Sequence, residues 1–213
     1  PAVPMLRAGN DMHRRTRGTM RIRAMLIICC AALAGCRAAL PARAAGEQDA
    51  FWASLQRLCG QAYAGTVVNP SPADSGFVGQ PLVMHVRRCS PGEIRIPFHV
   101  GENRSRTWIL TRTDGGLRLK HDHRHEDGSE DAITQYGGDT RDAGTAARQE
   151  FYADAHTASL IPAAVTNVWT MEVIPGERFA YALRREGTDR RFRVEFDLTR
   201  PVAPPPAPWG HQD

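Results

Sequence analysis

The segment NVWTMEVIPGERFAYALRREGTDRRFRVEFDLTRP, residues 167–201, decides the fold. Apolar side chains occupy every second position in three successive runs, and charged side chains such as Arg193 and Glu195 stand between them. A period of two is typical of a β-strand with one buried face. Turn signals at Pro175-Gly176 and at residues 186–189 separate the runs. We therefore predict three antiparallel strands here.

The same alternation extends toward the N-terminus over residues 82–86, 94–100 and 105–125, with a hairpin signal at residues 114–116. Residues 47–63 have helical spacing, with Gly60 as a helix-ending residue, and residues 151–162 hold one short helix. We predict an all-β, mainly antiparallel fold of about 8–10 strands, a closed or nearly closed β-barrel with a short N-terminal helix. A β-sandwich is the alternative. The charged outer face speaks against a transmembrane barrel.

The start of the chain has a different character. Residues 20–36, MRIRAMLIICCAALAGC, combine a basic head with an apolar run that is too short for a membrane-spanning helix of about 20 residues. This pattern is typical of a secretory signal peptide. The run ends in Leu33-Ala34-Gly35-Cys36, which resembles a lipoprotein lipobox and implies lipidation of Cys36. Cleavage near Ala42-Arg43-Ala44, giving a free exported form, is the alternative.

These features divide the chain into four parts. We interpret residues 1–19 as an upstream segment that is non-native or precedes the true translation start, and residues 20–46 as signal peptide and linker. Residues 47–200 form a single barrel domain, and residues 201–213 form a proline-rich tail. The resemblance to bacterial lipoproteins implies outer-membrane sorting, because Arg37 rather than aspartate follows Cys36, so we expect a periplasmic protein anchored to the outer membrane by lipid alone.

The charge of the predicted domain argues against nucleic-acid binding. The whole chain has a formal net charge of +4. Residues 1–46 hold 8 of the 27 Lys and Arg but 1 of the 23 Asp and Glu, which leaves 19 basic and 22 acidic side chains, a net charge of −3. A nucleic-acid-binding domain needs a basic surface. We instead expect a small-molecule ligand or an envelope protein as partner, and a monomeric barrel.

Two cysteines, Cys59 and Cys89, lie in the predicted domain. A pair of cysteines in an exported protein favours a disulfide. We predict that these two are bonded; two separate buried thiols are the alternative.

The segment LKHDHRHEDGSED, residues 119–131, places His121, His123 and His125 at alternate positions, on the same strand face as Leu119. They should point inward, toward one mouth of the barrel. Residues two apart on a strand lie about 6.6 Å apart, so neighbouring histidines could share a zinc ion, while residues four apart, at about 13 Å, could not. The site would need a further ligand, for which Asp131 and His85 are candidates. A hydrogen-bonded histidine ladder without metal is the alternative.

Other polar groups are predicted to lie outside the barrel. The acidic turn after the histidines reads as a solvated turn, and His85 and His99 are out of phase with their apolar neighbours and are expected on the exterior. Arg104, Arg106 and Arg112 are candidates for binding an anion, although such arginines more often pair with surface carboxylates. No nucleophile motif or phosphate loop is present, and TDGGL and YGGD are interpreted as hairpin turns. No cofactor is predicted beyond the zinc alternative.

Several segments carry a resemblance. LVMHVRRC, EIRIPFHVGENRSRTWILTRT, LRLKHDHRHEDGSED and RRFRVEFDLTRPV resemble an exported, lipoprotein-type family of proteobacteria that has no established activity. The resemblance implies a compartment and a domain extent, and no reaction. The architecture also resembles the calycin barrels by fold analogy only. The stretch Ala64-Gly65-Thr66-Val67 lacks the lipocalin Gly-x-Trp signature.

These observations lead to three hypotheses. The first is non-enzymatic binding of a small apolar or amphipathic ligand by an aromatic interior face that includes Trp108, Trp169, Tyr181 and Phe196. The second is a structural lipoprotein that binds an envelope partner, for which a sizeable exposed apolar patch would be needed. The third is a metal-assisted enzyme that uses the three histidines.

Overall fold

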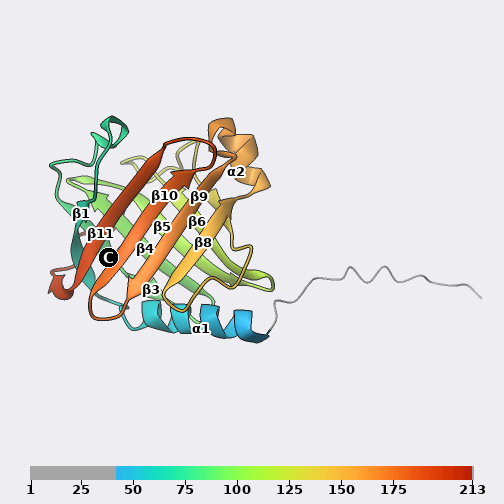
Figure 1. Cartoon of the computed structure of the whole chain (residues 1–213). Coiled ribbons are helices and arrows are strands. Elements are labelled where there is room, and N and C mark those ends of the chain that lie inside the picture. Colours follow the sequence, from blue (N-terminus) through green and yellow to red (C-terminus); the bar gives the residue numbers. More distant parts are fainter. Residues whose placement is uncertain (1–41, 213) are drawn as a thin grey trace, which may run out of the picture. The chain divides into compact units, whose positions relative to one another are not determined.

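The computed structural model describes residues 42–212 (Figure 1). In this part of the chain eleven strands form one antiparallel sheet. Ten of them close into a barrel, because β2 pairs with β1 on one side and with β4 on the other, while β3 pairs with β4 outside the barrel. The predicted closed barrel is confirmed, and the β-sandwich alternative is wrong. The strands are β1 (Ala62–Val67), β2 (Leu82–His85), β3 (Arg88–Cys89), β4 (Glu93–Val100), β5 (Asn103–Thr113), β6 (Gly116–His123), β7 (Tyr136–Asp139), β8 (Arg148–Ala153), β9 (Asn167–Ile174), β10 (Arg178–Arg185) and β11 (Arg191–Val202).

The period-two pattern of residues 167–201 separates the inside of the barrel from the outside, as expected. Met171, Val173 and Val194 are fully buried in the core. On the opposite face of the same strands, Glu172 accepts hydrogen bonds from Arg178 at 2.9 Å and from Arg193 at 3.1 Å. Ion pairs thus cover the exterior of β9–β11, while apolar side chains fill the interior.

One end of the barrel is closed by α1 (Ala42–Gln56), which lies across it in Figure 1. Phe51, Trp52 and Leu55 of this helix are buried within the same apolar cluster as the strand side chains. The helix begins earlier than the predicted residue 47 and ends before Gly60, which has a positive φ of 83°. The predicted disulfide between Cys59 and Cys89 is present and joins the chain after α1 to β3.

The YGGD segment is a strand, not the hairpin turn that we predicted. It forms β7, between β6 and β8. A Cβ atom on Gly137 would lie 1.9 Å from the Leu119 carbonyl oxygen, and one on Gly138 would lie 1.7 Å from that of Tyr152. The glycines therefore permit close approach of neighbouring strands rather than a reversal of the chain.

Three short helical segments surround the other end of the barrel. They are η1 (Pro72–Asp74), α2 (Ala155–Leu160) and η2 (Pro162–Ala164), and α2 lies at the end remote from α1 in Figure 1. The α2 helix, which falls within the predicted range 151–162, is capped by the Asp154 side chain, which accepts from the Thr157 amide at 2.8 Å. Within residues 42–212, no helix has the length and apolar character needed to cross a membrane.

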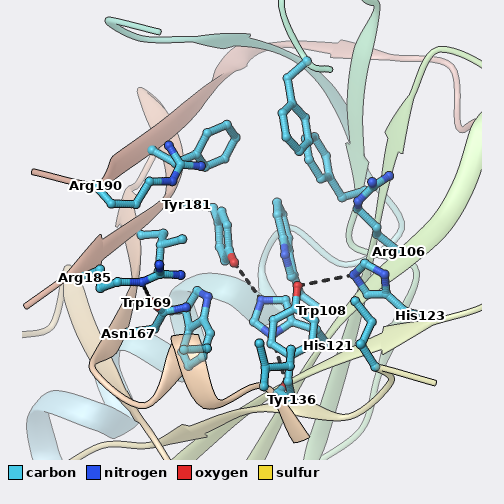
Figure 2. Close-up of a pocket in the computed structure, with 17 residues that line it drawn as sticks. Arg106, Trp108, His121, His123, Tyr136, Asn167, Trp169, Tyr181, Arg185 and Arg190 are labelled. Atoms are coloured by element: carbon cyan, nitrogen blue, oxygen red, sulfur yellow. Dashed lines mark hydrogen bonds between the residues drawn. The ribbon is translucent and has the colours of Figure 1, made fainter. Parts of the chain in front are cut away.

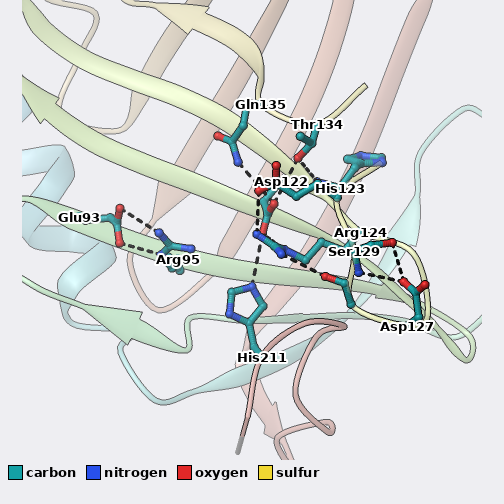
Figure 3. A network of polar contacts seen from close by, with 12 residues as sticks. Glu93, Arg95, Asp122, His123, Arg124, Asp127, Ser129, Thr134, Gln135 and His211 are labelled. Carbon is teal, nitrogen blue, oxygen red and sulfur yellow. Dashed lines mark hydrogen bonds and ion pairs between the residues drawn. The ribbon is translucent and has the colours of Figure 1, made fainter. Parts of the chain in front are cut away.

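The C-terminal tail packs on the outer face of the barrel instead of extending away from it. Two residues that follow β11 contact Arg104 of β5. The Ala207 carbonyl accepts a hydrogen bond from the Arg104 side chain at 3.2 Å, and the Trp209 amide donates to the Arg104 carbonyl at 3.1 Å. Figure 3 shows His211 of the tail beside Asp122, with Nε2 and Oδ2 separated by 3.3 Å. Asp122 is buried and also accepts a hydrogen bond from Arg124 at 3.1 Å.

His85 and His99 are predicted on the exterior, and this holds for the direction of their side chains but not for their exposure, because both are buried. Both lie out of phase with the core, as the sequence indicated, yet they are 7% and 4% exposed. The tail covers neighbouring parts of the outer face, where Pro208 and His211 lie close to Pro97 and Thr107. Strand parity therefore predicts the direction of these side chains, but it does not predict what packs over them.

Candidate ligand-binding pocket

A half-open cavity of about 250 Å³ lies inside the barrel, at the end remote from α1 (Figure 2). Side chains of β4, β5, β6, β7, β9, β10 and β11 line it, together with residues of the segments that surround this end. None of the lining residues is acidic. They are Phe77, Phe98, Arg106, Trp108, His121, His123, Ile133, Tyr136, Ile161, Ala164, Asn167, Trp169, Tyr181, Leu183, Arg185, Arg190 and Phe192.

His121 lies at the floor of the pocket and is 3% exposed. Its Nδ1 lies 3.1 Å from the Tyr136 carbonyl oxygen, which can only accept, so Nδ1 carries the proton. Its Nε2 therefore accepts from the Tyr181 hydroxyl at 2.7 Å. Burial lowers the pKa of His121 to about 3, so the ring is neutral at physiological pH. The inward orientation that we predicted for this histidine is confirmed.

His123 and Tyr136 continue this polar floor toward the opening. The Tyr136 hydroxyl lies 3.3 Å from His123 Nε2, and the Tyr136 ring stacks on His121 with centroids 4.3 Å apart. Burial, with the nearby charge of Arg106, lowers the pKa of His123 to about 4. Burial raises the pKa of Tyr136 to about 12. All three groups are therefore uncharged near neutral pH and offer hydrogen bonds without adding charge.

Aromatic side chains form the walls. Trp108 stacks on Tyr181 with ring centroids 4.4 Å apart, and Trp169 lies 5.3 Å from the His121 ring. These three predicted ligand-binding residues line the pocket. The fourth, Phe196, is fully buried and packs edge-on against Trp108 at 6.3 Å, but it does not line the pocket. Its place is in the packed core beneath the pocket wall.

Arginines stand at the pocket end of three inward-facing rows of side chains. Arg106 precedes Trp108 by two residues, Arg185 follows Leu183 by two, and Arg190 precedes Phe192 by two. Figure 2 shows Arg106 next to His123, and Arg185 and Arg190 on the other side of the cavity. Arg190 is paired with the buried carboxylate of Asp74 at 2.7 Å.

The other two pocket arginines contact neutral acceptors. Arg106 donates to Asn103 Oδ1 at 3.1 Å and to Ser105 Oγ at 3.3 Å, and Arg185 donates to Asn167 Oδ1 at 2.9 Å. Within residues 42–212 neither guanidinium has a carboxylate partner. The remaining arginine candidates from the sequence lie outside the pocket: Arg112 pairs with Asp49 of α1, and Arg104 binds the tail.

The three histidines of the predicted metal site separate in the structure. His121 and His123 line the pocket, whereas His125 lies beyond the end of β6 and is exposed. Both ring nitrogens of His121 already have partners. Among residues 42–212, no three His, Cys, Asp or Glu side chains converge as metal ligands would. Zinc binding at these histidines stays a prediction.

The acidic turn after the histidines is solvated, as the sequence indicated. Glu126 and Asp127 are exposed, and Asp127 accepts from the Ser129 amide at 2.9 Å within the turn (Figure 3). Cys36, the predicted lipidation residue, lies outside the described residues.

Sequence reasoning missed several residues of the pocket. The sequence predicts a turn at Tyr136, and it does not mark Asn167 or Arg185 as candidates. The parity of β10 provides a signal for Arg185, because this residue continues the inward row of Tyr181 and Leu183. Phe77 follows a loop segment whose path over the barrel has no periodic signal.

The chain matches no protein-family description, no curated protein and no solved structure.

Proposed function

We propose that this protein is a non-enzymatic binding protein of the cell envelope that holds a small apolar or amphipathic ligand inside its barrel. The observation that carries the proposal is the aromatic cavity at one end of an otherwise packed interior. An apolar cavity of about 150 Å³ suffices to bind benzene in another protein. The cavity of about 250 Å³ in this protein has space for a ligand larger than benzene.

The distribution of exposed apolar side chains supports this proposal over a broad partner-binding surface. In the described residues, the exposed large apolar side chains are Val78, Ile133, Val165 and Val202. Ile133 lines the pocket, and Val78 and Val165 directly follow the lining residues Phe77 and Ala164 in sequence. Ile133 therefore places exposed apolar surface at the cavity, as expected for a ligand entrance.

The envelope location rests on the sequence features of residues 20–46, with Cys36 as the anchoring residue. The Cys59–Cys89 disulfide is consistent with it, because structural disulfides persist in oxidising compartments such as the periplasm.

The test is binding of an uncharged apolar dye, N-phenylnaphthylamine, followed by its fluorescence. Ala164 is buried and lines the cavity, so Ala164→Trp should fill the space and abolish the dye signal. Its neighbour Ala163 is exposed, and Ala163→Trp is the matched control that should retain the signal. Circular dichroism checks that both variants are folded. Dye binding that is equal in the two variants would contradict the proposal, as would a wild-type protein that binds none.

A further inference from the structure

The pocket contains positive charge that the described protein does not neutralise. On the outer face of the barrel, Glu172 forms ion pairs with Arg178 and Arg193, and Asp139 forms an ion pair with Arg118. Arg106 is instead held by the neutral oxygens of Asn103 and Ser105. Removing a cation from water without an anionic partner is unfavourable, so such a position is well suited to a ligand that supplies the anion.

Arg106 is better placed for this than the other pocket arginines. It pairs in register with His123 across β5 and β6, which places it beside the polar floor. Its guanidinium carbon lies 5.6 Å from the centre of the Phe77 ring, which supports the side chain on its apolar side. Arg190 is already neutralised by Asp74, and Arg185 stands on the opposite wall (Figure 2).

The neutral groups near Arg106 leave its charge dominant. His123 is uncharged near neutral pH because its pKa is lowered to about 4, first by burial. Tyr136, at 3.3 Å from His123, is also uncharged, since burial raises its pKa to about 12. In the part of the chain that the structure describes, no carboxylate lines the cavity to compete with an incoming anion. Arginine binds carboxylates with two parallel hydrogen bonds, which makes it a specific partner for such a group.

The aromatic wall determines the rest of the ligand. Trp108 and Tyr181 present stacked ring surfaces to the cavity, and Trp169 faces it from β9. Flat apolar groups pack well against such surfaces. We propose, building on the ligand-binding function above, that the pocket binds an organic carboxylate with a compact one- or two-ring apolar body, and that Arg106 binds the carboxylate.

The experiment compares matched pairs of probes by calorimetry at neutral pH: benzoate with benzamide, and naphthoate with naphthamide. Each pair has the same shape and differs in charge. Wild-type protein should bind the acid of at least one pair about tenfold or more tightly than the amide, because hydrogen bonds to charged groups are stronger than neutral ones. Arg106→Met should remove this preference, because it should weaken binding of the acid far more than binding of the amide.

Two further variants make the result specific. Arg88→Met changes the net charge equally, but Arg88 is exposed on β3 outside the barrel, so it should retain the preference. Arg106→Lys keeps the charge and should recover part of the preference. Circular dichroism and thermal unfolding check each fold.

The outcomes separate the two proposals. If acid and amide bind equally and Arg106→Met changes neither, the pocket binds ligands but the carboxylate inference is wrong. Loss of preference in Arg88→Met as well as in Arg106→Met would show a general charge effect and would also overturn it. If wild-type protein binds neither the probes nor the uncharged dye, the proposed function itself fails, and this inference with it.

Discussion

The two ends of the barrel are built in opposite ways. At one end, α1 inserts Phe51, Trp52 and Leu55 into the apolar core, and the adjoining Cys59–Cys89 disulfide ties the chain to β3. At the other end, short helical segments surround a cavity whose floor consists of hydrogen-bonded histidine and tyrosine side chains. The same inward-facing rows of side chains run through both regions.

This difference gives the barrel a closely packed end and an end that contains a cavity. Close-packed apolar side chains stabilise the closed end, because removing apolar surface from water is favourable. At the open end, aromatic and arginine side chains border a cavity instead of packing against other side chains. Packing is therefore weaker there, and the cavity has space for a ligand. We therefore expect substitutions at the closed end to change mainly stability, and substitutions at the open end to change mainly binding.

The largest expected effect is at the closed end. Phe51 is fully buried, so Phe51→Ala should lower the free energy of unfolding by about 3–5 kcal/mol, because apolar contacts are lost and a cavity remains. Urea denaturation followed by circular dichroism measures this. Ile133→Ala at the open end, where the side chain is 39% exposed, is the control and should cost much less. Equal losses would remove the distinction between the ends.

The disulfide should have the next largest effect. Its cysteines are separated by 30 residues, and a covalent loop of this length stabilises by about 3.6 kcal/mol in the chain-entropy model. The double variant Cys59→Ser, Cys89→Ser should therefore unfold at lower urea concentration while retaining dye binding, since neither cysteine lines the pocket. A double variant that loses dye binding under conditions where it is still folded would contradict the independence of the two ends.

The open end should account for part of the acid sensitivity. The pKa of His121 is lowered to about 3, mainly by burial, from the ordinary value of 6.5. The unfolded chain therefore binds a proton below about pH 6.5 that the folded protein does not, and stability falls by about 1.4 kcal/mol per pH unit as pH drops from there toward about 3.

The measurement is the free energy of unfolding between about pH 7 and pH 5, above the range in which most carboxylates titrate. His121→Gln should reduce the slope, and His156→Gln, which changes an exposed histidine on α2, should leave it unchanged. An unchanged slope in His121→Gln would mean that other groups determine the acid sensitivity.

The smallest predicted loss of stability follows from removing the hydrogen bond at the pocket floor. Tyr181→Phe keeps the ring but leaves His121 Nε2 buried without its hydrogen-bond donor. This should lower the free energy of unfolding by about 1–3 kcal/mol. Tyr152→Phe is the control, because the Tyr152 hydroxyl bonds Glu150 on the outer face of β8 at 3.2 Å and should contribute little. Thermal unfolding of the two variants compares them. A larger loss in Tyr152→Phe would contradict the assigned importance of the floor.

Some features of the molecule follow from local sequence. The alternation along residues 167–201 determines which side chains of β9–β11 face the core, since successive residues of a strand point to opposite faces. The disulfide was predictable because two cysteines in the predicted domain leave one pairing. Parity also placed Trp108, Trp169, Tyr181 and His121 inside the barrel.

Other features depend on how distant segments pack. Trp108 and Phe196 both face inward, yet Trp108 lines the pocket and Phe196 lies in the core, because α1 fills one end of the barrel and leaves the other partly open. Likewise, His99 points outward but is buried on a face that the C-terminal tail partly covers. Strand periodicity specifies the direction of a side chain, whereas its depth and its neighbours arise only when the barrel closes and the remaining segments pack against it.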